Sequence, residues 1–396
     1  MMAKKLNKIN INSDLIDAFR NKVNETDFFS GKLKNVNGKN HWNLLCSAMD
    51  WITVASDGLP EIKLEIGGMG YNHLKTINLM QYVITVDVLV ESIIQLYRVL
   101  NSGEPYPLDD SKNIFCHEEL SDDKYFKHIR AVFSTHPVSL KSFDGVKRSN
   151  DERYFASWVS EMPDIVDEYD FYVFLYSNDP NKDSLNSFGI NLDKVNEFAL
   201  QRYELLNDLI NRVDIIIKEH ITNYKEKSIP ESDDIIEQLS ILAEENEKRF
   251  GKGYGYSYEI HYLQKLFITE VEMYGFDEKF TAILNDYKDY MITGINEIKR
   301  NLQTMSDHGY YIKHRAGGYE FEKIYTYFAD GNHPIGKEYF QGLINLEKLP
   351  IKLIELNDMQ LNRLMMDAYL FSVCEETGNE RIKLGDIVEL VYPNYK

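Results

Sequence analysis

The chain has 396 residues, which is enough for two or three domains. Hydrophobic residues make up 43% of it and aromatic residues 13%, so the chain can bury a sizeable core, which argues against a disordered protein. Its formal net charge of −19 argues against a protein that wraps nucleic acid along its whole length or binds an anionic membrane surface.

The sequence shows no sign of secretion or of a membrane span. The polar residues 1–10 are not followed by the apolar segment of a signal peptide. The most apolar stretch, Leu79–Leu100, contains Asp87, Glu91 and Arg98, and charges at this density exclude a bilayer span. The three cysteines lie far apart and form no CxxC pair, which is typical of reduced thiols. We therefore expect a cytoplasmic protein that does not contact membranes.

Helical periodicity dominates the chain and predicts most of its elements. Helices are expected at Ser13–Val23, Trp42–Ala55, Tyr71–Leu100, Asp123–Thr135, Asn191–Lys218, Glu231–Phe250, Ser257–Met273, Asp277–Met305 and Asn357–Val373. The aromatic segment Tyr169–Ser177, closed by turn residues, predicts a strand, and Ile387–Tyr392 predicts another. Tyr71–Leu100 is apolar around most of its circumference, as a central helix is. The expected fold is mainly α: a helical bundle with further long antiparallel helices and a minor β element.

Changes in composition divide the chain into three expected regions. Residues 1–150 are expected to form a helical bundle, residues 151–305 a strand with long helices, and residues 306–396 a C-terminal region. The second boundary is placed at Ser306, where a segment rich in Gly, Tyr and Pro begins.

Motifs for metals and cofactors are weak. Cys116, His117 and the two glutamates that follow them lack a second pair of ligands at the spacing of a metal site. The glycines of residues 67–70 precede a helix, but their spacing matches neither the dinucleotide fingerprint nor a phosphate-binding loop. We therefore expect neither a metal nor a cofactor.

A local basic segment, residues 124–148, stands out in this acidic chain. Its single acidic residue, Asp144, is outnumbered by six basic ones: Lys124, Lys127, Arg130, Lys141, Lys147 and Arg148. The resulting local charge of +5 can attract phosphate where the rest of the surface repels it. The four lysines and Arg148 are therefore candidate RNA-binding residues, and RNA is the expected partner.

Arg130 and His136 lie within the basic segment, six positions apart. On a continuous α-helix this spacing would leave the two side chains about 120° apart and unable to share a target. Pro137 changes this, because the residue before a proline is pushed out of the helical region. We expect the helix to end near Thr135, with His136 free to turn back toward Arg130 and with Pro137 suited to begin the next helix.

An arginine and a histidine that converge in a basic pocket form a minimal metal-free ribonuclease site. His136 can take a proton from a ribose 2′-hydroxyl or protonate the leaving oxygen. Arg130 can stabilise the charge that develops on the phosphate. Both are therefore candidate catalytic residues, although the same pair is also consistent with RNA binding without catalysis or with packing alone.

An arginine followed after four to six residues by a histidine is the signature of HEPN domains. Residues 124–137, KYFKHIRAVFSTHP, resemble the helix that carries this signature, and the resemblance extends from about Tyr71 to Tyr224. It implies an all-helical ribonuclease or nucleotide-binding module of the kind found in bacterial toxin–antitoxin and anti-phage defence systems. It also implies a homodimer, because HEPN sites are generally completed by two domains, and an antitoxin or defence-system partner.

Further polar residues are candidates for a supporting role. Asp87, Glu91 and Arg98 share one side of the central helix, where they either form a solvent-exposed edge or face the site. In the second case Glu91 would orient Arg130 or His136. His128 lies beside the motif, either on the surface or in contact with substrate. The competing interpretation is a non-catalytic helical scaffold that binds nucleotide, RNA or protein and uses Arg130 and His136 for packing.

Overall fold

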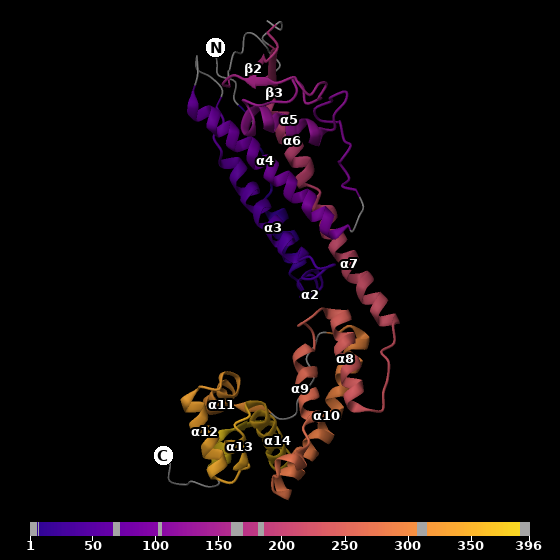
Figure 1. Cartoon of the computed structure of the whole chain (residues 1–396), viewed down its shortest axis with the longest axis vertical. Coiled ribbons are helices and arrows are strands. Elements are labelled where there is room, and N and C mark those ends of the chain that lie inside the picture. Colours follow the sequence, from indigo (N-terminus) through magenta and orange to yellow (C-terminus); the bar gives the residue numbers. More distant parts are fainter. Residues whose placement is uncertain are drawn as a thin grey trace. The chain divides into compact units, whose positions relative to one another are not determined.

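The computed structural model describes residues 6, 8–65, 72–101, 105–159, 169–180, 186–306 and 315–388. The chain divides into two compact units, Met1–Glu219 and His220–Lys396, each of which contains its own cluster of buried apolar residues. The elements of both units are labelled in Figure 1.

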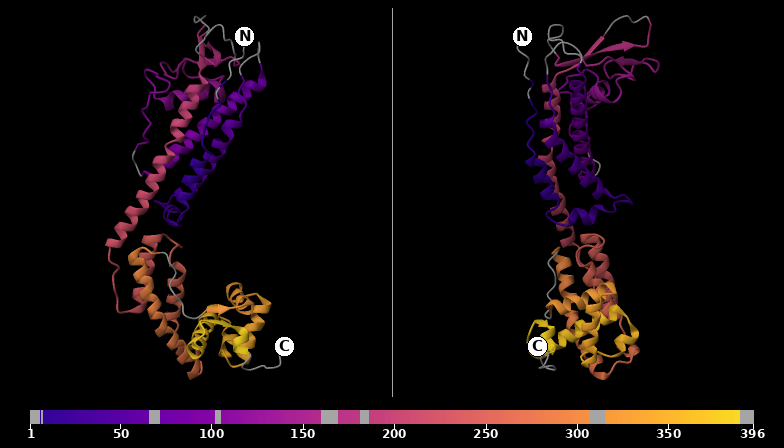
Figure 2. Two further views of the ribbon diagram at one scale, coloured as in Figure 1. Left: turned by 180° about the vertical axis from the view of Figure 1, so that it is seen from behind. Right: turned by 90° about the vertical axis from the view of Figure 1, so that its left-hand side faces the viewer.

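Unit 1 is a helical bundle with a small sheet. Its helices are α1 (Asp14–Val23), α2 (Phe28–Leu33), α3 (His41–Gly58), a 3₁₀ turn (Leu59–Glu61), α4 (His73–Leu100), α5 (Asp122–Arg130), α6 (Leu192–Tyr203) and the first part of α7 (Leu206–Glu226). Asn40 and Asn72 begin α3 and α4 by accepting hydrogen bonds from backbone N–H groups of the first turn. The two helices pack lengthwise (Figures 1 and 2). Buried residues occur along α4 from Leu79 to Leu100, as expected for a central helix.

The sheet of unit 1 is antiparallel, in the order β1 (Tyr154–Ala156), β2 (Phe171–Ser177) and β3 (Asn186–Ile190). In its register Tyr154 lies opposite Ser177, and Phe171 lies opposite Ile190. The strand predicted at Tyr169–Ser177 is therefore confirmed as β2. Its buried apolar residues belong to the same core as the helices, and the sheet lies near α5, toward the end of the bundle where α4 begins (Figure 1).

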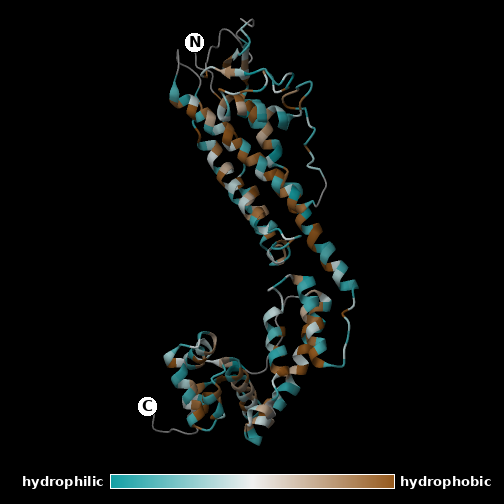
Figure 3. Ribbon diagram, viewed as in Figure 1, coloured by the Kyte–Doolittle hydropathy of each residue, from teal (hydrophilic) through white to brown (hydrophobic). Residues whose placement is uncertain are grey.

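Unit 2 consists of helices and a two-stranded parallel sheet. Its elements are α8 (Ile235–Phe250), α9 (Ser257–Ile268), a 3₁₀ turn (Val271–Tyr274), α10 (Glu278–Thr304), β4 (Arg315–Gly317), α11 (Tyr319–Asp330), α12 (Pro334–Asn345), α13 (Lys352–Leu356), α14 (Met359–Thr377), β5 (Arg381–Lys383) and α15 (Leu384–Val388). Apolar and polar residues alternate along these helices with helical periodicity (Figure 3), which gives each helix a buried and an exposed side.

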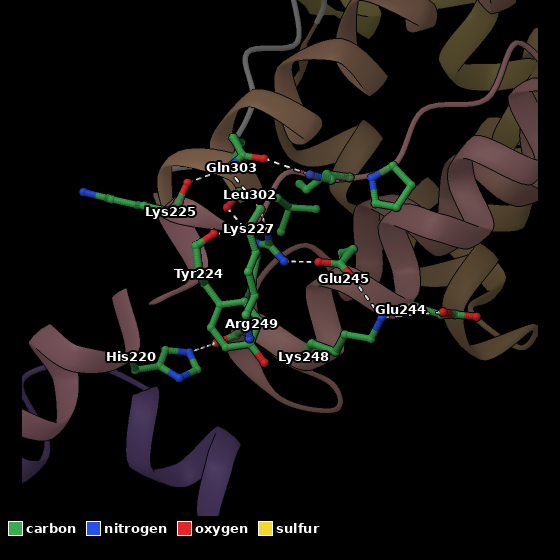
Figure 4. A network of polar contacts seen from close by, with 12 residues as sticks. His220, Tyr224, Lys225, Lys227, Glu244, Glu245, Lys248, Arg249, Leu302 and Gln303 are labelled. Carbon is green, nitrogen blue, oxygen red and sulfur yellow. Dashed lines mark hydrogen bonds and ion pairs between the residues drawn. The ribbon is translucent and has the colours of Figure 1, made fainter. Parts of the chain in front are cut away.

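Arg249 joins three helix ends in unit 2, and its side chain is completely buried. Its guanidinium donates hydrogen bonds to the carbonyls of Tyr224 and Lys227 near the end of α7, to the carbonyl of Leu302 near the end of α10, and to the carboxylate of Glu245 (Figure 4). The last carbonyls of a helix have no partner within the helix, so a buried arginine that donates to them satisfies groups that burial would otherwise penalise.

The prediction of a mainly α fold with a minor β element is confirmed. The observed division after Glu219 differs from the expected boundaries at residues 150 and 305, because the sheet and α6 share a core with the first helices, and α10 shares a core with the helices that follow residue 305. The helix predicted at Asn191–Lys218 is interrupted between α6 and α7. Of the strand predicted at Ile387–Tyr392, Ile387 lies in α15, and residues 389–392 lie outside the described residues.

Within the described residues, no helix is long and apolar enough to cross a membrane.

Candidate functional site

Arg130 is the last residue of α5 and pairs with a carboxylate on α4. Its Nη1 donates a hydrogen bond of 2.6 Å to Oδ2 of Asp87. The side chain of Arg130 is 32% exposed and that of Asp87 is 22% exposed, so solvent reaches both charges. Nε of Arg130 is buried and has no hydrogen-bond partner among the described residues. Asp87 therefore orients the guanidinium of Arg130 but accepts only some of the hydrogen bonds that the guanidinium can donate.

The backbone between Arg130 and His136 forms a π-helical turn, Ala131–Thr135. The N–H of His136 donates to the carbonyl of Ala131 at 2.9 Å, and the hydroxyl of Ser134 donates to the carbonyl of Arg130 at 2.7 Å. His136 itself leaves the helical conformation, with φ −139° and ψ 38°. The prediction that the helix ends near Thr135 is confirmed. π-turns are rare and often occur at functional sites.

His136 is exposed, whereas the backbone around it is anchored. Its carbonyl accepts a hydrogen bond from Ser139, and the carbonyl of Pro137 accepts one of 2.7 Å from Ala156 in β1. Pro137 therefore leads toward the sheet. The expectation that Pro137 begins the next helix is wrong. Within the described part of the chain, no hydrogen bond or ion pair joins His136 to Arg130. The structure places the two residues at opposite ends of one π-turn.

Of the two carboxylates expected to support the motif, only Asp87 contacts it. Glu91 is exposed and interacts with its own helix: its Oε1 accepts a hydrogen bond of 2.6 Å from Gln95 and lies 3.7 Å from Nη1 of Arg98. Glu91 and Arg98 thus form an exposed edge of α4, the first of the two alternatives that their spacing allowed.

His128 is buried, so the surface position expected for it is wrong, whereas the alternative of substrate contact stays a prediction. Its ring Nε2 lies 3.0 Å from the carbonyl of Phe143, and its ring meets that of Phe188 edge to face. Gly145 packs so closely that a Cβ there would lie 3.1 Å from Cβ of His128, and its φ of +92° also favours glycine. His128 therefore fastens the loop of residues 141–148 to α5.

Acid is expected to destabilise unit 1 through His128. Burial lowers the pKa of His128 below its ordinary value of 6.5, so the unfolded chain binds this proton more tightly than the folded chain does. The contribution of the neutral His128 imidazole to the stability of unit 1 is therefore present above pH 6.5. It is lost as the pH falls through the lower pKa of the folded state, where the buried imidazole must take up a proton. Urea denaturation from about pH 8 to about pH 5 should show a smaller loss of stability for His128→Gln than for the wild type. Equal losses in the two proteins would contradict this assignment.

Four lysines of the basic segment remain available to a ligand. Lys124 and Lys127 lie on α5, and Lys141 and Lys147 lie on the loop that His128 fastens to this helix. All four are exposed, and none forms an ion pair with another described residue. All four therefore add positive charge to the surface around α5 and this loop.

Arg148 contributes less to this surface, because it is paired. Its guanidinium donates hydrogen bonds of 2.8 and 2.7 Å to the two carboxylate oxygens of Asp144, and it lies 3.4 Å from Glu119. Burial opposes ionisation of Asp144, but the hydrogen bonds from Arg148 and from the N–H of Val146 lower the pKa of Asp144 overall. The spacing of four residues between Asp144 and Arg148 was the signal in the sequence that could have predicted this pair.

The site thus combines an oriented arginine, an exposed imidazole and four exposed lysines, which are groups suited to phosphate binding and proton transfer. Among the described residues, no three His, Cys, Asp or Glu side chains are grouped as metal ligands would be. None of the protein families, curated proteins or solved structures compared with the chain matches it.

Proposed function

We propose that unit 1 is a metal-independent endoribonuclease in which His136 transfers a proton and Arg130 stabilises the reacting phosphate. The observation that carries the proposal is the Arg130–Asp87 ion pair, which orients the guanidinium one π-turn away from the exposed imidazole of His136. The resemblance of the motif to HEPN domains and the four exposed lysines support the same activity.

In this reaction the ribose 2′-oxygen attacks phosphorus, the bond from phosphorus to the 5′-oxygen breaks, and a 2′,3′-cyclic phosphate forms. His136 accepts the 2′-hydroxyl proton or donates a proton to the leaving 5′-oxygen. The donors of Arg130 that Asp87 leaves unused bind the phosphate oxygens as their negative charge increases. A second copy of the chain supplies the other histidine, so we propose a homodimer that acts in the cytoplasm.

The resemblance to HEPN domains extends the proposal to the biological setting. HEPN ribonucleases act as effectors of bacterial toxin–antitoxin and anti-phage systems, and we propose the same role here, with an antitoxin or another defence component as partner.

The Arg130–Asp87 ion pair also favours a second candidate function, a non-catalytic scaffold that binds RNA, nucleotide or protein. Asp87 balances the charge of Arg130, and the pair joins α5 to α4. In a scaffold this contact serves packing, and the lysines alone attract phosphate.

The activity is tested by incubating the purified chain with total RNA in EDTA. We expect cleavage to continue, because proton transfer by His136 and charge stabilisation by Arg130 need no metal. Activity that EDTA abolishes and Mg²⁺ restores would contradict the mechanism. Binding of RNA that weakens with salt, without any cleavage, would favour the scaffold.

Light scattering on the same sample tests the dimer, because an active, stable monomer would contradict a site built from two copies.

A further inference from the structure

A small cavity in unit 2 lies between α9 and α14. It has a volume of about 80 Å³ and is lined by Tyr258, His261, Tyr262, Lys265, Gln360, Arg363 and Leu364. The side chains from α9 recur at positions 258, 261, 262 and 265, which places them on one face of the helix. Those from α14 recur at positions 360, 363 and 364, so two helix faces close the cavity between them.

Arg363 is held in this cavity by aromatic rings. Its guanidinium carbon lies 5.3 Å from the centre of the Tyr258 ring and 5.6 Å from the centres of the Tyr262 and Tyr325 rings. Such contacts fix a cation through the faces of the rings. Nε of Arg363 is buried, and the guanidinium makes no hydrogen bond to any described residue. Its donors are therefore positioned but unused.

The carboxylate of Asp367, the ion-pair partner that the described residues give Arg363, already has other partners. Asp367 lies 3.8 Å from Nε of Arg363, beyond hydrogen-bond distance, and accepts hydrogen bonds from the hydroxyls of Tyr262 and Tyr325. Asp367 therefore forms an ion pair with Arg363 and offsets part of its charge, but it accepts no hydrogen bond from the guanidinium. On the open side of the cavity, Lys265 and His261 are exposed and form no ion pair with any described residue.

The size of the cavity limits what it can hold. A volume of about 80 Å³ suits one tetrahedral oxyanion and is well below the roughly 300 Å³ and more of pockets that enclose a whole small-molecule ligand. The remainder of a larger ligand must lie outside it. Tyr258 lines the cavity and is 57% exposed, which leaves an aromatic surface beside it on which a base can stack.

We propose that this cavity binds the phosphate of a 5′-phosphate monoester, with the attached nucleoside against Tyr258. Arg363 and Lys265 provide the positive charge, and an arginine fixed in place is suited to bind two phosphate oxygens at once. The ligand is either a free nucleotide or the 5′-phosphate end of an oligonucleotide, because both present the same group. The site belongs to unit 2 and does not depend on the ribonuclease activity proposed for unit 1.

Calorimetric titration of the full chain with AMP, adenosine and inorganic phosphate tests the proposal. We expect AMP to bind at least about tenfold more tightly than adenosine, because only AMP supplies the charged acceptor for Arg363 and Lys265. Lys265→Gln should weaken AMP binding by about tenfold, whereas Lys337→Gln, an exposed lysine on α12, should leave it unchanged. Tyr258→Leu should weaken binding of AMP by about fivefold or more and binding of inorganic phosphate by less, because phosphate has no base to stack and Tyr262 and Tyr325 still hold Arg363.

Competition with DNA tetranucleotides shows whether the ligand is a free nucleotide or an oligonucleotide end. One tetranucleotide carries a 5′-phosphate and the other does not. DNA is used because it lacks the 2′-hydroxyl that cleavage requires. Displacement of AMP by the phosphorylated tetranucleotide alone assigns the site to oligonucleotide ends, and failure of both to displace AMP assigns it to free nucleotides. Equal binding of AMP and adenosine, absence of AMP binding, or unchanged AMP affinity in a correctly folded Lys265→Gln variant would overturn the proposal.

Discussion

Replacing His136 with alanine is expected to reduce RNA cleavage by on the order of 10²-fold or more, because the variant loses the group that transfers the proton. The fold should tolerate the change. His136 is exposed, and the hydrogen bonds that hold the π-turn use its backbone and not its imidazole. Substitutions at such positions usually change the free energy of unfolding by less than about 0.5 kcal/mol. Cleavage rates and melting temperatures of the two proteins measure both effects.

Two further variants separate chemistry from packing at the same site. Arg130→Lys keeps a positive charge that can pair with Asp87 but loses the planar guanidinium, so we expect poor cleavage with a nearly unchanged melting temperature. His41→Ala removes a histidine of unit 1 at the start of α3 and should leave cleavage unchanged. If His136→Ala and Arg130→Lys both unfold early while the wild-type protein leaves RNA intact, the pair serves packing and the scaffold function is the correct one.

Replacing Arg249 with methionine is expected to destabilise unit 2 by about 3–5 kcal/mol, because the carbonyls of Tyr224, Lys227 and Leu302 lose their buried donor, and each buried polar group left unsatisfied costs about 1–3 kcal/mol. The same change leaves the carboxylate of Glu245, which is 13% exposed, with Lys248 as its remaining ion-pair partner (Figure 4). For a unit of this size, each kcal/mol of lost stability lowers the melting temperature by about 2–4 °C. The melting temperature of unit 2 should therefore fall by about 6–20 °C. Calorimetry of the full chain measures the shift.

Arg300→Met is the matched control for Arg249→Met. Arg300 forms a similar intrahelical ion pair with Glu297, but its side chain is 70% exposed, so its loss should cost less than about 1 kcal/mol. Equal melting temperatures for the Arg249 and Arg300 variants would show that the network in Figure 4 is not a main source of stability.

Most helices, and the end of the helix that carries Arg130, could be predicted from the sequence alone. Long helices such as α4 and α10 were predictable within a few residues, because apolar side chains at helical spacing must be buried on one side. Pro137 ended the preceding helix near Thr135 through a clash with the residue before it, which is a local effect. The positive charge of residues 124–148 was also predictable, because it follows from the number of basic and acidic residues in the segment.

Which charged side chains are paired and which are not depends on how distant segments pack together, so it could not be predicted from the sequence. Asp87 lies 43 positions from Arg130 and reaches it because α4 and α5 pack together, whereas Glu91, one turn farther along α4, does not. His128 belongs to the same helix as the exposed lysines, yet it is buried because the loop containing Phe143 folds over it. The cavity at Arg363 joins two helices nearly a hundred positions apart. Ion pairs and cavities of this kind depend on contacts between distant segments, and the periodicity of a single segment carries no information about them.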